Sequence, residues 1–113
     1  MFLTKRVYEP TATTDGPRFL VERLWPRGIK KASLKMDGWL KDAAPSTELR
    51  RWFNHDPDKW QAFRKRYFAE LKRHGEALQP LRDAEQRHGK VTLLFSSRDT
   101  EHNNAVALRD YLS

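Results

Sequence analysis

The sequence predicts a single small α/β domain over residues 1–113, with an at least partly parallel sheet of three or four strands and helices packed on it. The clearest strand is Val91–Phe95, an apolar run typical of a strand buried on both faces of a parallel sheet. The clearest helix follows Pro57, because apolar side chains recur there at i, i+3, i+7 and i+11 and form one stripe. These side chains belong to Trp60, Phe63, Tyr67 and Leu71. A chain of 113 residues has room for one hydrophobic core.

The remaining strands are expected in the first third of the chain. Phe2–Tyr8 and Arg18–Leu24 are rich in β-branched, aromatic and other apolar residues, which predicts two strands. Between them, Asp15-Gly16-Pro17 has a composition typical of a turn. Leu34–Leu40 alternates in part between apolar and polar residues and is the candidate for one further strand.

Capping residues indicate where the helices begin. Ser46 is expected to cap a short helix, and Asp56 to cap the long helix with Pro57 at its first position, where a missing N–H group costs nothing. Pro80 is expected in the first turn of the third helix or at a kink in it. The expected helices cover residues 47–53, 57–74, 76–88 and 101–112.

The bulk composition limits the compartment and the partners. The chain has 22 Lys and Arg residues against 15 Asp and Glu residues, a formal net charge of +7, which favours anionic metabolites or polyanions as partners. The absence of cysteine excludes disulfides, thiolate nucleophiles and zinc–cysteine sites, and fits a reducing compartment. No apolar run approaches the ~20 residues of a membrane span, and the N-terminus lacks the apolar core of a signal peptide. We therefore expect a cytoplasmic protein without a membrane partner.

The first candidate site follows the buried strand. Ligands of open α/β sheets bind at the carboxyl ends of the strands, where helix N-termini present free N–H groups. Ser96, Ser97 and Arg98 would supply hydroxyl groups and a cation for an anion there, and His102 and Asn103 are expected in the first turn of the next helix. In the alternative interpretation, Asp99 or Thr100 caps this helix and the serines only satisfy the loop.

The second candidate is the turn that leaves the second expected strand. Arg23 and Arg27 flank Trp25 and a proline, and guanidinium groups bind phosphate or carboxylate through paired hydrogen bonds. We expect the two arginines to clamp an anion and Trp25 to form a stacking wall. In the alternative interpretation, Trp25 belongs to the core and the arginines pair with Glu22 and other acids.

The third candidate is a nucleic-acid surface. Basic and aromatic residues interleave over residues 50–56, and Lys59, Arg66 and Arg73 recur every seven residues on one face of the long helix. In the alternative interpretation, the aromatic residues of this segment are the buried face of a short helix, and the basic residues of the long helix form a face that is only exposed to solvent. Arg64 falls near the apolar stripe, so it needs a partner, either a structural carboxylate or a ligand.

Conventional catalytic motifs are absent from the sequence. The four histidines lack metal-ligand spacing, and no HExxH, P-loop, GxGxxG or GxSxG motif occurs, so no metal site is expected and the cofactor stays open. If the protein is an enzyme, His102 is the best candidate for the general acid or base, because histidine titrates near neutrality.

Several segments together resemble the YeaO-like family, small bacterial proteins also classed as domain of unknown function 488. These segments are Leu20–Gly28, Ala44–Ser46 followed by Leu49–Phe53, Trp60–Leu71, and Val91–Leu94 followed by His102 and Asn103. The resemblance implies an α/β fold and joins the arginine turn and the post-strand loop into one site. It also implies an aspartate where this chain has Glu22, and, in broader relatives, a cysteine where it has Ser96 or Ser97.

The sequence thus favours a protein that binds a phosphate- or carboxylate-bearing ligand at the carboxyl ends of its strands. A reaction on that ligand and simple binding both stay open. The rivals are a nucleic-acid-binding module that uses the basic helix face, and an adaptor for an acidic protein. A closed pocket in which arginines converge with Trp25 favours the small ligand, whereas a continuous basic stripe favours nucleic acid.

Overall fold

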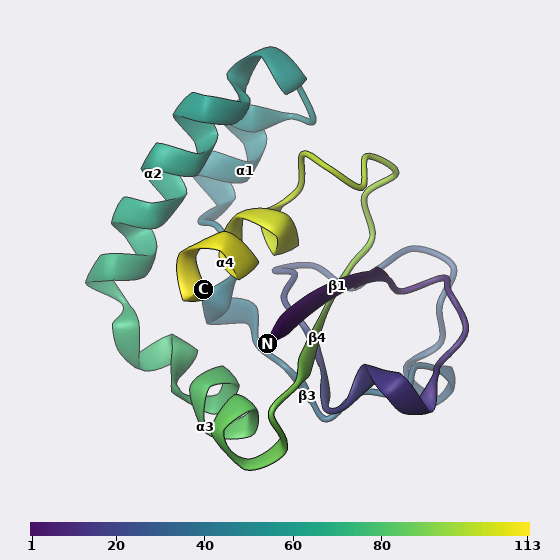
Figure 1. Ribbon diagram of the computed structural model, residues 1–113. Helices are drawn as coiled ribbons and strands as arrows, with labels where there is room; N and C mark the ends of the chain where they lie inside the picture. The colour runs from purple at the N-terminus through teal and green to yellow at the C-terminus, as the bar shows by residue number, and fades with distance from the viewer.

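The computed structural model describes residues 1–113 as a four-stranded sheet with four α-helices. The strands are β1 (Phe2–Arg6), β2 (Arg18–Leu20), β3 (Gly38–Trp39) and β4 (Val91–Phe95), in the spatial order β1-β4-β2-β3. The helices are α1 (Thr47–Phe53), α2 (Trp60–Arg73), α3 (Gln79–His88) and α4 (Asn104–Leu112), gathered on one side of the sheet (Figure 1). Every strand pair is parallel, so the predicted α/β fold class is confirmed.

Strand β4 is the interior strand that its apolar sequence predicts. It pairs with β1 on one side and β2 on the other, and all five of its residues are buried. Side chains of a strand alternate between the two faces of its sheet. Leu93 and Phe95 accordingly join the core beneath the helices, whereas Leu94 joins a smaller cluster with Val7 and Leu20 on the opposite face.

The opposite face is covered by irregular chain between β2 and β3 rather than by a helix. Large side chains pack on the smaller cluster: Trp25, Ile29, Leu34 and Met36 from this segment, and Trp39 from β3. The turn at Gly28 has a positive φ of 76°, a conformation that glycine adopts without a steric cost. Because its large side chains pack on the smaller cluster, the segment between β2 and β3 is a packed part of the domain.

Three strands are shorter than their apolar composition predicts. β1 ends at Arg6 instead of Tyr8, β2 ends at Leu20 instead of Leu24, and β3 contains only two residues of the expected segment 34–40. β1 ends where its partner β4 ends, because Arg6 pairs with Phe95 and one more backbone hydrogen bond, from Val7 N to Phe95 O, follows. β2 ends for another reason. Beyond Leu20 the next ladder groups have side-chain partners, since Ser96 N donates to the Glu22 carboxylate and the Val21 carbonyl oxygen accepts from Asn104 Nδ2.

The predicted start of α1 and the predicted capping residues Ser46 and Asp56 are confirmed, but α2 and α3 begin three residues later than expected, each after a short 3-10 turn. The Ser46 side chain accepts a hydrogen bond from Leu49 N at 3.1 Å and caps α1. Asp56 caps a short 3-10 turn over Pro57–Lys59 that leads directly into α2. Pro80 lies in the first turn of α3. None of the helices has the length and apolar character needed to cross a lipid bilayer.

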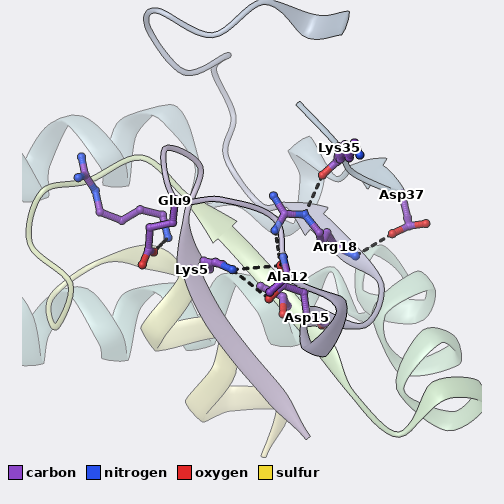
Figure 2. Close-up of polar contacts among 9 residues, drawn as sticks. Lys5, Glu9, Ala12, Asp15, Arg18, Lys35 and Asp37 are labelled. Carbon is purple, nitrogen blue, oxygen red and sulfur yellow. Dashed lines mark hydrogen bonds and ion pairs between the residues drawn. The ribbon is translucent and has the colours of Figure 1, made fainter. Parts of the chain in front are cut away.

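A buried network of charges ties the loop-covered face together (Figure 2). Asp15 accepts hydrogen bonds from Lys5 Nζ at 3.1 Å and from the guanidinium of Arg18, and Arg18 Nε donates to the carbonyl oxygen of Lys35 at 2.8 Å. A carboxylate oxygen of Asp37, Oδ2, accepts a hydrogen bond from Arg18 N at 2.8 Å. The Asp15 carboxylate thus links its own loop to β1 and β2, and Arg18 extends the network to the loop that contains Lys35. The charged groups of Lys5, Asp15 and Arg18 all have partners within the protein.

Candidate functional site

A cleft of about 810 Å³ opens at the carboxyl ends of the strands, and we call it the strand-end cleft. Three segments that are distant in the sequence line it: the turn after β2, the loop after β4, and the end of α1 with the residues that follow. Its lining includes Glu22–Arg27, Ser96–Asp99, Asn103, Asn104, Arg50, Arg51 and Phe53–His55. This volume is in the range of small-molecule sites, ~300–1,000 Å³.

The turn after β2 brings all three of its predicted site residues to the cleft. Arg23 Nε donates to the carbonyl oxygen of Pro45 at 3.0 Å, so this guanidinium is held against the chain before α1. Arg27 is exposed, and its side chain makes no hydrogen bond or ion pair within the protein. The Trp25 indole donates to the carbonyl oxygen of Ile29 at 2.6 Å and contacts the ring of Trp39 edge-on, so Trp25 serves both the loop-side packing and the wall of the cleft.

The loop after β4 also lines the cleft, but its hydroxyl groups have internal partners. Ser96 Oγ lies 3.0 Å from Glu22 Oε1, and Ser97 Oγ accepts a hydrogen bond from Asp99 N at 3.2 Å. Arg6 supports the loop from β1, because its Nε donates to the carbonyl oxygen of Ser97 at 2.9 Å. Arg98 is exposed and its side chain has no partner within the protein.

Helix α4 begins three residues later than predicted, and its cap differs from both expected caps. Asn103, not Asp99 or Thr100, caps the helix, and its side chain accepts a hydrogen bond from Val106 N at 3.0 Å. Asp99 instead accepts hydrogen bonds from Glu101 N and His102 N, which closes a turn ahead of the helix. These hydrogen bonds lower the pKa of Asp99 against the opposing effect of burial. His102 and Asn103 therefore precede the first turn instead of lying within it.

His102 is the one predicted site residue that lies outside the lining of the cleft. Its Nδ1 lies 3.0 Å from Asp99 Oδ2, and its ring packs edge-on against Trp60 with 5.3 Å between ring centres. No hydrogen bond joins it to Ser96 or Ser97. Its role as a general acid or base stays a prediction, whereas Asn103 reaches the cleft together with the serines and Arg98.

Positive charge dominates the cleft. Five arginines line it: Arg23, Arg27, Arg50, Arg51 and Arg98. None of them forms an ion pair, because the six ion pairs of the protein involve other residues. The cleft has two carboxylates, of which Asp99 pairs with His102. The other, Glu22, forms no ion pair, so the expected alternative of arginines paired with Glu22 does not occur.

Glu22 is the functional candidate that the sequence reasoning missed. Its Oε1 accepts hydrogen bonds from Ser96 N at 2.7 Å and from Ser96 Oγ at 3.0 Å, which links the ends of β2 and β4. Burial raises the pKa of Glu22, while the Ser96 hydrogen bonds and the positive charges of His55 and Arg50 oppose that rise. The only available signal was its place next to the arginine turn, because the sequence put Glu22 inside the expected strand Arg18–Leu24, whereas β2 ends two residues before it.

Most of the segment 50–56 belongs to the strand-end cleft rather than to a separate surface, since Arg50, Arg51 and Phe53–His55 line it. Asn54 and His55 adopt the left-handed conformation with φ values of 46° and 56°, which is uncommon for residues other than glycine. Both residues line the cleft, next to Arg50 and Arg51. Two successive positions of this kind turn the chain sharply between α1 and α2 and bring the end of α1 to the sheet edge.

The basic face of α2 is partly engaged within the protein. Lys59 Nζ donates to the carbonyl oxygen of Trp52 at 2.9 Å, and both Lys59 and Arg66 lie over the Trp52 ring. Arg73 lies elsewhere, at a smaller pocket of about 250 Å³. Arg64 pairs with Asp110 at 3.1 Å, which is the structural carboxylate expected for it.

Comparisons with known proteins agree with the resemblance carried by the sequence motifs. A family model described as "Inactive DUF488-N3 subclade" matches residues 1–113. The uncharacterised protein YeaO of Escherichia coli (strain K12) is 45% identical over 108 residues, which cover 96% of this chain and 93% of that protein. The uncharacterised proteins Mb3100c of Mycobacterium bovis and Rv3073c of Mycobacterium tuberculosis are each 40% identical over 108 residues, 96% of this chain and 90% of theirs. No solved structure matches the chain. The chain belongs to the DUF488-N3 family, in the subclade described as inactive.

Proposed function

We propose that this protein binds a small phosphate- or carboxylate-bearing ligand in the strand-end cleft. The observation that carries the proposal is the set of five arginines around one cleft, none of which has a carboxylate partner. Like charges gathered around one space repel one another, and an anion placed among them removes that cost. Arginine is also the side chain best suited to paired hydrogen bonds with phosphate or carboxylate.

Binding without a reaction fits the two serines of the cleft. Each hydroxyl group has a partner within its own loop or the neighbouring turn, and neither is bonded to a histidine. A serine nucleophile needs a base within hydrogen-bond reach, and here the histidine of the loop pairs with Asp99 away from the lining. The description of the family as an inactive subclade agrees with this role.

Replacing Arg27 with alanine tests the proposal. Because the Arg27 side chain has no partner within the protein, we expect the free energy of unfolding without anion to change by no more than about 0.5 kcal/mol. Inorganic phosphate should stabilise the wild-type protein by mass action, and loss of one charged hydrogen-bond donor should weaken that binding by about tenfold or more. Denaturation midpoints of both proteins, measured across a phosphate titration at constant ionic strength, give the two quantities.

The matched control is Arg87→Ala, which removes an exposed arginine from α3, outside the cleft. This variant should respond to phosphate as the wild type does. An equal response of all three proteins would contradict the proposal, as would a clear loss of stability of Arg27→Ala without anion. Binding of DNA or RNA that falls steeply with salt and disappears when Lys59, Arg66 and Arg73 are changed to glutamate would instead support a nucleic-acid interface on α2.

A further inference from the structure

The strand-end cleft contains a carboxylate that an anion site does not need. Glu22 lies among the arginines, where its negative charge would repel a ligand that carries only an anionic group. Its Oε1 is engaged by Ser96 N and Ser96 Oγ at 2.7 and 3.0 Å. These contacts fix the orientation of the carboxylate, but they engage only one of its two oxygens.

The second oxygen, Oε2, is free to accept a hydrogen bond from a ligand. No donor of the protein reaches it, since both hydrogen bonds to the Glu22 side chain end on Oε1. It is not sealed from solvent either, because Arg64 Nε is the only buried side-chain polar atom without a partner. Glu22 lines the cleft, so Oε2 is an acceptor held at a set position in its wall.

Aromatic side chains line the same space. Trp25, from the turn after β2, is partly exposed and presents aromatic surface to the cleft. Phe53 and Phe63, whose ring centres are 4.3 Å apart, border the same space, but they belong to the core and are 6% and 1% exposed. A lining that combines aromatic surface, guanidinium groups and one fixed acceptor suits a ligand with a planar ring, an anionic group and an N–H donor on the ring.

We infer that Glu22 selects the ligand, and that the strand-end cleft takes a nucleoside monophosphate whose base donates an N–H group to Glu22 Oε2. This inference rests on the proposed function and adds the base to the anion. The arginines bind the phosphate, and Trp25 contacts the base. The N–H group of the base offsets the repulsion between Glu22 and the phosphate, because it fills the acceptor that a bare anion leaves open.

The test compares ligands that differ by single features, at about pH 8. Adenosine, guanosine and cytidine 5′-monophosphates carry an exocyclic amino group on the base. Purine riboside 5′-monophosphate keeps the ring and the phosphate without that group, and ribose 5-phosphate lacks the base. Because a hydrogen bond to a charged acceptor is among the stronger ones, at least one amino nucleotide should bind about tenfold more tightly than both comparison ligands in isothermal titration calorimetry.

Glu22→Gln tests whether Glu22 is the acceptor. Ser96 N is an obligate donor, so it fixes the glutamine oxygen at the position of Oε1 and places the amide NH₂ group where Oε2 was. A donor then faces the donor of the base, and the preference for the amino nucleotide should disappear while ribose 5-phosphate binds at least as well as before. Glu48→Gln, the same substitution at an exposed residue of α1 outside the cleft, should keep the preference.

A stability measurement separates loss of selection from loss of the fold. Burial raises the pKa of Glu22, so its ionised form is disfavoured in the native state, and stability is lost as the pH rises through that pKa. Glu22→Gln removes this effect and keeps the Ser96 hydrogen bond. The variant should be no less stable than the wild type at about pH 8, and any advantage should shrink toward pH 4.

The outcomes are distinct. Equal affinity for amino nucleotides, purine riboside monophosphate and ribose 5-phosphate would overturn the inference and leave the proposed function standing. A preference that persists in a folded Glu22→Gln variant would also overturn it. If no phosphate-bearing ligand binds, inorganic phosphate included, the proposed function fails as well.

Discussion

Replacing Asp15 with asparagine is expected to lower the free energy of unfolding by about 3–5 kcal/mol at pH 7. The Asp15 carboxylate is the only acid that pairs with Lys5 and Arg18, and the Arg18 side chain is 5% exposed. Asparagine has nearly the same shape but no charge, so it would leave a buried guanidinium and a largely buried ammonium group without a counter-ion. The cost of an uncompensated buried charge exceeds that of most single substitutions.

The effect of Asp15→Asn should depend on pH in a defined direction. Burial acts against ionisation of Asp15, but hydrogen bonds from Ala12 N, Lys5 and Arg18 outweigh it and lower the pKa below its usual value. A carboxyl group with a lowered native pKa contributes its full stability above its unfolded pKa of about 3.9 and loses it as the pH falls through the native value. The difference between wild type and variant should therefore be constant from pH 7 to about pH 5 and shrink in stronger acid.

Urea denaturation across this pH range measures the Asp15 effect. Asp42→Asn is the matched control, because Asp42 is exposed and its side chain makes no hydrogen bond or ion pair. It should change the free energy of unfolding by no more than about 0.5 kcal/mol. A similarly small effect of Asp15→Asn at pH 7 would show that the charge network of Figure 2 does not hold the loop-covered face together.

Replacing Leu94 with alanine should cost about 2–5 kcal/mol, because it leaves a cavity in the smaller cluster. Leu94 is fully buried between Val7 and Leu20, beneath side chains of the irregular segment that follows β2. A large cost therefore depends on that segment forming a packed layer. The size of the effect measures how rigidly the turn with Arg23 and Arg27 is supported.

Leu24→Ala is the control for Leu94→Ala, since Leu24 is 59% exposed. The same deletion of methyl groups should change the free energy of unfolding by no more than about 0.5 kcal/mol there. If Leu94→Ala is as mild as the control, the irregular segment does not form a second core. Chemical denaturation of the two variants and the wild type under one condition decides between these results.

Elements whose signal is local in the sequence are predicted well. Val91–Phe95 is an unbroken apolar run, and such a run is stable only in the interior of the sheet, where β4 lies. The caps at Ser46 and Asp56 were also visible, because a cap acts on N–H groups two or three residues away. The stripe of α2 is confirmed for Phe63, Tyr67 and Leu71, which are buried, while Trp60 packs against the core partly exposed.

Ends of elements depend on partners that the local sequence does not contain. β2 stops at Leu20, although Val21 and Leu24 have the composition of a strand, because the distant side chains of Glu22 and Asn104 bind Ser96 N and the Val21 carbonyl oxygen, which would continue the ladder. The start of α4 moved to Asn104 for a similar reason. Asp99 is used to close the preceding turn with Glu101 N and His102 N, so Asn103 takes the cap.

By itself, the sequence determined the α/β fold class, the buried strand, the caps of the first helices and the arginines that a ligand could use. Only the tertiary structure decided that Arg50, Arg51 and Phe53–His55 share one cleft with the arginine turn and the loop after β4, and that Glu22 accepts hydrogen bonds from Ser96. The physical reason is the range of the interactions. Helix periodicity and capping act over a few neighbouring residues, whereas Glu22 and Ser96 are 74 positions apart and meet because β2 and β4 are adjacent strands.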